Sequence, residues 1–188
     1  MSQRELLALV IGELNRLGIP YMLTGSLASS MQGVPRSTHD IDLVVALASE
    51  QIDALVAAFG EPDYYLSREA IQDALRNRSM FNLISLADGE KVDFWMLTDE
   101  RFDQARFARK QEEDANGVRI SVSSPEDTIL AKLRWARLTG NGDKHIKDAM
   151  HVYELQRPSL DVTYLESWVK QLGVADLWAR LQVEARPL

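Results

Sequence analysis

Apolar residues recur along the chain with two different periods, and the changes of period predict its first elements. Residues 3–17 place apolar side chains three or four positions apart, which predicts an amphipathic helix ending at Gly18. The apolar run 21–23 predicts a short strand. A tight turn, a short helix and a loop containing Pro35 separate it from a second strand, whose apolar part is 43–45. This order of helix, strand, helix and strand is typical of an α/β unit.

Mixed periods continue through the middle of the chain. Helical spacing predicts helices over 48–59, 68–77 and 100–107. Alternating apolar positions predict strands over 80–86 and 91–97, and the Asp88-Gly89 pair between them is typical of a hairpin turn. A second hairpin is predicted around Asn116-Gly117.

The last third of the chain has only the helical period. Ser124 and Pro125, followed by two acidic residues, form a typical helix start. Further helices are predicted over 143–155, 161–173 and 174–183. The pattern therefore indicates two domains, an α/β core over 1–122 and a helical C-terminal part over 123–188.

Composition excludes several classes of protein. The 188 residues are 46% hydrophobic and 26% charged, which is ordinary for a soluble globular chain. The absence of cysteine excludes both a disulfide framework and a thiolate metal site. No run of 18 apolar residues exists, and the amphipathic N-terminus is unlike a signal peptide. We therefore expect a cytoplasmic protein without a membrane segment.

Charge is distributed unevenly. The formal net charge is −7, which argues against a general nucleic-acid binder. Residues 1–100 are strongly acidic, whereas residues 128–147 contain five basic residues and one acidic residue. A solvated helix face explains such a basic segment as well as a phosphate-rich substrate does.

Three aspartates are candidates for a metal site. Asp40 and Asp42 flank Ile41 in a predicted strand, so both carboxylates point to the same face. Two carboxylates so close repel each other unless a cation or a proton lies between them. Asp93 lies in an otherwise apolar strand, where a buried charge needs a partner. It is either a third carboxylate of the same site or a solvent-facing acid paired with Lys91 or Arg78.

A phosphate-binding turn is predicted before the aspartate pair. Gly25 permits close approach of the backbone, and Ser26 adds a hydroxyl group at the start of a helix, where free N–H groups favour anions. Gly-Ser alone is usually an ordinary turn and N-cap. Followed by Asp40 and Asp42 and a later Asp93, it is far more specific. Carboxylates and substrate phosphates together are the ligands that Mg²⁺ uses in proteins.

These motifs resemble those of the DNA-polymerase-β-type nucleotidyltransferase superfamily. The resemblance covers residues 18–97. The segment from Gly33 to Asp40, with Pro35, Arg36 and Thr38, is also similar to the abortive-infection nucleotidyltransferases of type IV toxin–antitoxin systems. Lys132 and the Lys147-Asp148 pair resemble the C-terminal motifs of that group. Two positions depart from the pattern, because Thr24 replaces an apolar residue and His151 replaces a frequent aspartate.

The resemblance implies a mixed sheet flanked by helices and a defined set of roles. Two Mg²⁺ ions, or Mn²⁺ in their place, would be held by Asp40 and Asp42, with Asp93 ligating the catalytic ion and helping to deprotonate a hydroxyl acceptor. The residues that would bind the nucleotide are Gly25, Ser26, Arg36, Lys132 and Lys147. The reaction implied is transfer of a nucleoside monophosphate from an NTP, with release of pyrophosphate.

The acceptor is the least determined part of the interpretation. RNA, in particular a tRNA end, is the leading hypothesis, with the protein acting as a toxin restrained by an antitoxin. A small molecule such as an aminoglycoside, or a protein side chain, is the second. A degenerate member that binds nucleotide without catalysis is the third.

Overall fold

The computed structural model describes residues 1–115, 117–139 and 142–186, which form two compact units. Unit 1 contains Met1–Thr24 and Thr38–Val122, and unit 2 contains Gly25–Ser37 and Ser123–Leu188. The chain therefore contributes to unit 2 twice. The division into domains at residue 122 stays a prediction, because a unit of close packing is not the same thing as a domain that folds alone.

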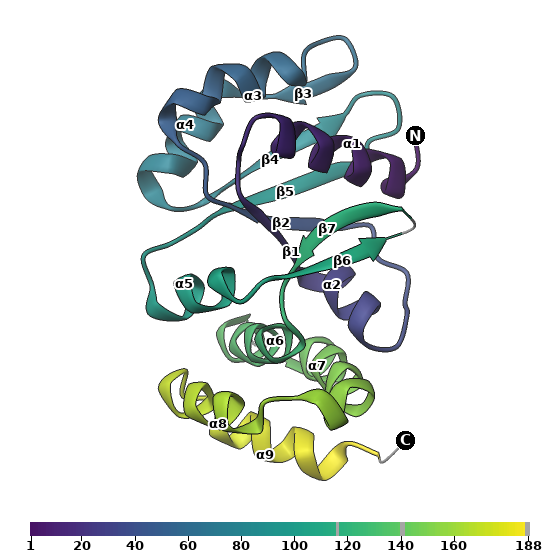
Figure 1. The fold of residues 1–188 in the computed structure, drawn as a ribbon, viewed down its shortest axis with the longest axis vertical. Helices are drawn as coiled ribbons and strands as arrows, with labels where there is room; N and C mark the ends of the chain where they lie inside the picture. Colours follow the sequence, from purple (N-terminus) through teal and green to yellow (C-terminus); the bar gives the residue numbers. More distant parts are fainter. Residues whose placement is uncertain (116, 140–141, 187–188) are drawn as a thin grey trace. The chain divides into compact units, whose positions relative to one another are not determined.

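Unit 1 is built on a seven-stranded mixed sheet (Figure 1). Its strands are β1 (Tyr21–Thr24), β2 (Ile41–Val45), β3 (Tyr64–Leu66), β4 (Met80–Ser85), β5 (Lys91–Met96), β6 (Gln111–Ala115) and β7 (Val118–Val122). They lie in the order β3-β4-β5-β2-β1-β7-β6. The central pair β2 and β5 is parallel, and β1 runs antiparallel to β2.

The two faces of the central strands differ in chemistry. One face is apolar throughout, because Leu43 and Phe94 lie side by side there and are fully buried. On the other face Met22 and Val44 pack with Phe107 at one end. Further positions of that face on the central strands are polar or charged and include Asp42 and Asp93 with Thr24 and Lys91, which places a polar site at the end of a packed sheet.

The helices of unit 1 form where the apolar spacing predicts them. They are α1 (Gln3–Arg16), α3 (Ile52–Ala58), preceded by the 3-10 turn η1 (Ser49–Gln51), α4 (Arg68–Asn77) and α5 (Arg101–Ala108). Ser2 and Ser67 cap α1 and α4 by accepting hydrogen bonds from backbone N–H groups in the first turn. Figure 1 shows α1, α3 and α4 gathered near β3 and β4.

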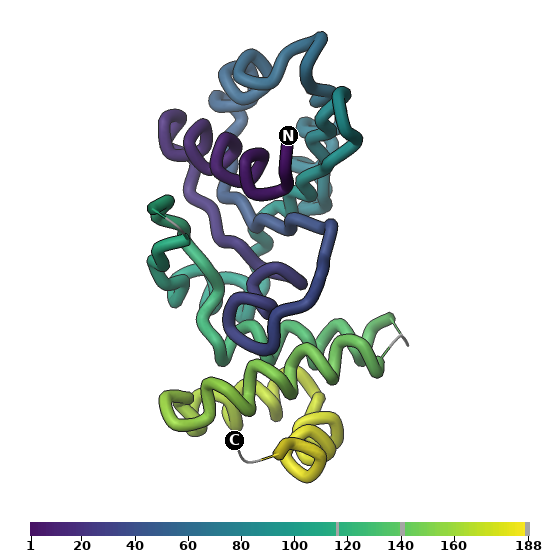
Figure 2. Tube along the Cα trace, turned by 90° about the vertical axis from the view of Figure 1, so that its right-hand side faces the viewer, coloured from purple at the N-terminus to yellow at the C-terminus, as the bar shows by residue number. Residues whose placement is uncertain are grey.

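The described part of unit 2 consists of helices and the loops that connect them. It contains α2 (Gly25–Gln32), α6 (Pro125–Thr139), α7 (Gly142–Gln156), the 3-10 turn η2 (Arg157–Ser159), α8 (Val162–Gln171) and α9 (Ala175–Glu184). The helices α6 and α7 lie side by side, and α2 packs against both (Figure 2). At Gly33, just after α2, an added Cβ would come within 2.9 Å of the backbone nitrogen of Val152 in α7. Only glycine permits this close approach.

The predicted mixed α/β class is confirmed, and most element boundaries agree with the sequence pattern within two residues. Asp40 differs, because β2 begins one residue later, at Ile41. Asn116, at the predicted second hairpin turn, lies outside the described residues. Among the helices that the structure describes, none is both long and apolar enough to cross a membrane.

Candidate functional site

Asp42 and Asp93 are direct neighbours on the two central parallel strands of unit 1. The register of β2 and β5 places their Cα atoms opposite each other. Asp40 precedes β2 and is exposed, two residues before Asp42 in the chain. We call Asp40, Asp42 and Asp93 the acidic face. The predicted proximity of Asp42 and Asp93 is confirmed by this register, whereas their role in a metal site stays a prediction.

Asp93 is buried, with 8% of its surface exposed, and both of its carboxylate oxygens have partners. Asn82, opposite Asp93 on β4, donates from Nδ2 to Oδ1 at 2.8 Å. Lys91 donates from Nζ to Oδ2 at 2.9 Å. Asp93 thus lies beside Asp42 and is paired with Lys91, but it is buried and does not face solvent, as the second alternative required.

Lys91 and Trp95 also lie next to the acidic face. Trp95 donates from Nε1 to Oδ1 of Asp42 at 3.3 Å, which fixes one oxygen of that half-buried carboxylate. The hydrogen bond to Asp93 raises the pKa of Lys91 above its ordinary value of 10.5, against the opposing effect of burial. The negative charges of Asp93, Asp40 and Asp42 raise it further. Lys91 therefore carries its positive charge next to three acids.

The residues of the acidic face fit a hard divalent cation in type and in strand position, because carboxylate oxygens are the preferred ligands of Mg²⁺. Within the described residues, however, the side chains form no ready group of three or more possible metal ligands. The oxygens of Asp93 point instead to Lys91 and Asn82. Metal binding by Asp40, Asp42 and Asp93 stays a prediction, and it requires Asp93 to exchange a partner.

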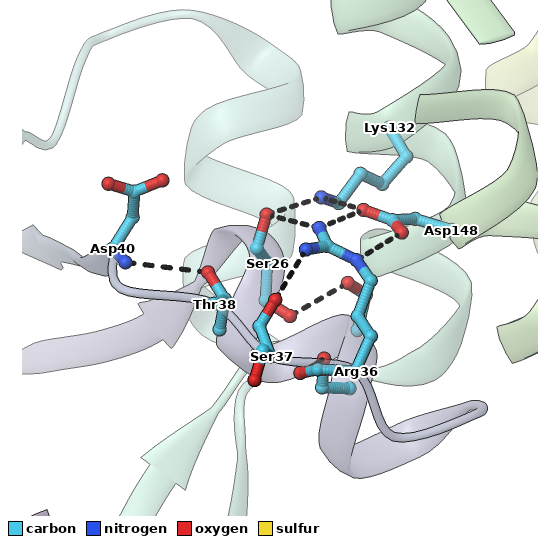
Figure 3. A network of polar contacts seen from close by, with 9 residues as sticks. Ser26, Arg36, Ser37, Thr38, Asp40, Lys132 and Asp148 are labelled. Atoms are coloured by element: carbon cyan, nitrogen blue, oxygen red, sulfur yellow. Dashed lines mark hydrogen bonds and ion pairs between the residues drawn. The ribbon is translucent and has the colours of Figure 1, made fainter. Parts of the chain in front are cut away.

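In unit 2, four side chains from three segments form one hydrogen-bonded cluster. Asp148 on α7 accepts two hydrogen bonds from Arg36, at 2.9 and 2.8 Å, and one from Lys132 on α6, at 2.8 Å. The Ser26 hydroxyl on α2 accepts from Arg36 at 2.8 Å and from Lys132 at 3.4 Å. Figure 3 shows Arg36 and Lys132 directed at both acceptors. We call these four residues the Asp148 cluster.

Burial makes the Asp148 cluster a tight ionic unit. The side chains of Lys132 and Asp148 are each 5% exposed, whereas that of Arg36 is 30% exposed. Burial alone would raise the pKa of Asp148. The hydrogen bonds and positive charges of Arg36 and Lys132 outweigh this effect and lower the pKa to about 2. Asp148 is consequently ionised at neutral pH and holds both cations in place.

The turn at Gly25 has the geometry that the sequence suggested. Gly25 begins α2 with a φ of +69°, a value that favours glycine. Ser26 is buried, and its hydroxyl serves the Asp148 cluster. Binding of phosphate by this turn stays a prediction.

Lys147 lies outside the cluster but lines a cavity of about 310 Å³ in unit 2. The other lining residues are Val34, Arg36, Lys144, Asp148 and His151. Lys144, Lys147 and His151 follow one another at intervals of three and four residues, so they share a face of α7. In the part of the chain that the structure describes, neither lysine has an ion-pair partner. The cavity therefore has a surplus of positive charge.

The structure brings together Ser26, Arg36 and Lys132 as one group and Asp42 with Asp93 as another. Sequence reasoning did not identify Asp148 as the centre of the first group, or Asn82 and Trp95 as partners in the second. In the sequence, Asp148 is recognisable only as part of the Lys147-Asp148 pair. Its pairing with Arg36 spans 112 positions, and no local periodicity indicates such a contact.

No protein-family model and no curated protein sequence matches the chain. Solved structures do match, and they show that the fold is that of nucleotidyltransferases. The solution structure of the antibiotic-resistance factor ANT(2'')-Ia matches with a TM-score of 0.57 and 17% identity, over 96% of this chain and 95% of that one. The crystal structure of ANT(2'')-Ia in complex with adenylyl-2''-tobramycin gives 0.54 and 18%, over 92% and 98%. An antigenic nucleotidyltransferase-like protein from Paracoccidioides brasiliensis gives 0.51 and 16%, over 97% and 92%.

Proposed function

We propose that this protein is a Mg²⁺-dependent nucleotidyltransferase that moves a nucleoside monophosphate from an NTP to a hydroxyl acceptor. The observation that carries the proposal is the register of Asp42 against Asp93 on neighbouring parallel strands, with Asp40 two residues before Asp42. The nucleotidyltransferase fold supports it.

In the proposed reaction, the acceptor oxygen forms a bond to the α-phosphorus and the bond from that phosphorus to the bridging oxygen of pyrophosphate breaks. Asp40 and Asp42 would hold two Mg²⁺ ions, with Asp93 as a further ligand of the catalytic ion, and these ions would supply charge neutralisation for the attacking and leaving oxygens. The Asp93 carboxylate would accept the proton of the acceptor hydroxyl, because it is an ionisable base on the buried side of the acidic face. The remaining contribution is positioning and fixed charge.

The phosphates of the NTP are assigned to the basic residues of unit 2. Ser26, Arg36 and Lys132 form a preorganised set of donors, since Asp148 fixes both cations without neutralising their combined charge. Lys147 extends this positive charge into the adjoining cavity of the same unit. Donors that are already fixed lose little freedom when an anion binds, which favours affinity.

For the acceptor we propose RNA, in particular a tRNA end, and a toxin-like role with an antitoxin as partner. The surplus of positive charge on Lys144 and Lys147 beside the cavity supports a phosphate-rich acceptor. A second candidate is a small hydroxylated molecule, and the fold shared with ANT(2'')-Ia, solved with adenylyl-2''-tobramycin, favours it.

Incubation of the protein with each α-labelled NTP, Mg²⁺ and either total RNA or an aminoglycoside tests the proposal. We expect label on tRNA, and a reduction of at least about a hundredfold in Asp42→Asn, because a residue that stabilises the transition state contributes several kcal/mol. Asp63→Asn is the matched control, since Asp63 is an exposed acid of the same unit just before β3.

Three other outcomes have separate meanings. Label on the aminoglycoside alone selects the second candidate. Label on the protein itself indicates a protein side chain as acceptor. Retained NTP binding with no transfer to any acceptor contradicts the enzymatic proposal and indicates a nucleotide-binding member without catalysis.

A further inference from the structure

Lys91 and Asp93 lie two residues apart on β5 and therefore point to the same face of the sheet. The Nζ atom of Lys91 lies 2.9 Å from Oδ2 of Asp93, and Nδ2 of Asn82 lies 2.8 Å from Oδ1. The two bonds engage both oxygens of a buried carboxylate. A cation that used Asp93 as a ligand would have to take the place of one of these donors.

The two donors differ in how easily they can leave. Asn82 is a short side chain on the neighbouring strand, and its Cα atom lies directly opposite that of Asp93. Lys91 has a long, flexible stem, and its side chain is 44% exposed, whereas that of Asp93 is 12% exposed. Its ammonium group can therefore move into water without burying an unpaired charge. Lys91 is the donor that a metal ion displaces at the lower cost.

We propose that Lys91 is a built-in counter-ion of the acidic face, which competes with the divalent cation for Asp93 and so sets the metal affinity of the site. This inference rests on the proposed function. In the absence of metal, the ammonium group offsets one of the three neighbouring negative charges. When metal binds, the Lys91–Asp93 pair breaks and Lys91 moves toward solvent. Lys91 acts on the metal through Asp93, so it is a positioning residue.

A purely structural ion pair would look the same in the structure but would behave differently. It would stabilise the fold with and without metal, and its loss would leave metal affinity unchanged or lower it. A competing counter-ion differs in its effect on metal affinity. Its loss also destabilises the metal-free protein, but it strengthens metal binding.

The test compares wild-type protein with Lys91→Met and Lys91→Gln, using Mn²⁺ alone as the probe and isothermal titration without nucleotide. We expect Lys91→Met to bind Mn²⁺ about tenfold more tightly, which corresponds to about 1.4 kcal/mol. We expect a smaller gain for Lys91→Gln, which keeps a hydrogen-bond donor but no charge. Lys91→Arg should bind as weakly as the wild type, because it keeps the cation.

Thermal unfolding with and without Mn²⁺ provides a second readout that needs no activity. Lys91→Met should unfold at a lower temperature than the wild type without metal, and should gain more from added Mn²⁺, because tighter binding gives more stabilisation. Lys170→Met, which removes an exposed lysine of unit 2, is the control for loss of one positive charge. Far-ultraviolet circular dichroism identifies any variant that fails to fold, in which case Lys91→Gln decides.

Equal or weaker Mn²⁺ binding by a folded Lys91→Met would falsify the inference and leave the proposed function intact, provided that Asp42→Asn abolishes both Mn²⁺ binding and transfer. Absence of any Mn²⁺ binding that depends on Asp42 would contradict the inference and the metal-dependent function together. The Asp42→Asn titration therefore separates the two failures.

Discussion

The acidic face of unit 1 and the Asp148 cluster of unit 2 both combine carboxylates with basic side chains, but in opposite proportions. On the acidic face, three carboxylates share one half-exposed lysine. In the Asp148 cluster, two cations share one carboxylate that is almost fully buried. The three acids and Lys91 of the first arrangement together carry a net negative charge, and the side chain of Lys91 is 44% exposed. In the second arrangement, removal of the Asp148 carboxylate would take away the acid that is paired with the buried charge of Lys132. The two groups thus differ less in residue type than in charge balance and burial.

Removal of the Asp148 carboxylate should produce the largest loss of stability. Asp148→Ala would leave Lys132, which is 5% exposed, as a buried cation without its carboxylate. We expect a loss of about 4 kcal/mol in the free energy of unfolding, as for other buried pairs that lose one partner. Urea unfolding measures the change. Asp143→Ala at the start of the same helix is the control, because that side chain is 94% exposed and should contribute less than about 1 kcal/mol. Similar losses in both variants would contradict the contrast in burial.

Acid should weaken the same cluster in a defined range of pH. The pKa of Asp148 is about 2 in the folded protein against an ordinary value of 3.8, so the folded state favours the ionised form. Its contribution is therefore present above about pH 4 and is lost as the pH falls through about 2, with a size of about 2 kcal/mol. Urea unfolding at a series of pH values, compared with Asp148→Asn, isolates the effect. If the free energy of unfolding of Asp148→Asn fell with pH as that of the wild type does, the loss of stability in acid would belong to other carboxylates.

Removal of an acid from unit 1 should raise the free energy of unfolding, and by the smallest amount of the three changes. Asp42→Asn removes one of two like charges that lie directly opposite each other, and its amide oxygen can still accept from Trp95. We expect the free energy of unfolding of the metal-free protein to rise by about 0.5 kcal/mol. Asp63→Asn should leave it unchanged. A clear loss of stability in Asp42→Asn would mean that the acidic face is already balanced without a metal.

The sequence predicted well what depends on neighbouring residues in the chain. The helix over Arg68–Asn77 and the strand pair around Asp88-Gly89 follow from apolar spacing and turn chemistry, and the structure has them. The grouping of Asp42 with Asp93 required one further assumption, that their two strands would be neighbours, and the β2–β5 register supports it. The sequence pattern places Asp40 inside the strand, whereas β2 begins one residue later. Strand ends are the part of an element that a periodic pattern determines least.

Contacts between distant segments could not be predicted in this way. Arg36 and Asp148 are 112 positions apart, and their meeting depends on how α2 and its following loop pack against α7. Likewise, the choice of Lys91 over Arg78 as the partner of Asp93 depends on side-chain direction, and Arg78 pairs with Asp99 instead. Such pairings are determined by tertiary packing, and the periodic patterns of a single sequence do not indicate them.

The double contribution of the chain to unit 2 has a consequence for the order of folding during synthesis. The thirteen residues Gly25–Ser37 leave the ribosome between β1 and β2, but their packing partners α6 and α7 follow about a hundred residues later. The sheet of unit 1 can be completed once Val122 has emerged, whereas α2 must wait with its buried side uncovered. Contacts of such high sequence separation form slowly, because a long loop has to close first. We therefore expect a nascent chain that ends near residue 122 to contain an ordered sheet and an exposed α2, which becomes protected only when the last helices arrive.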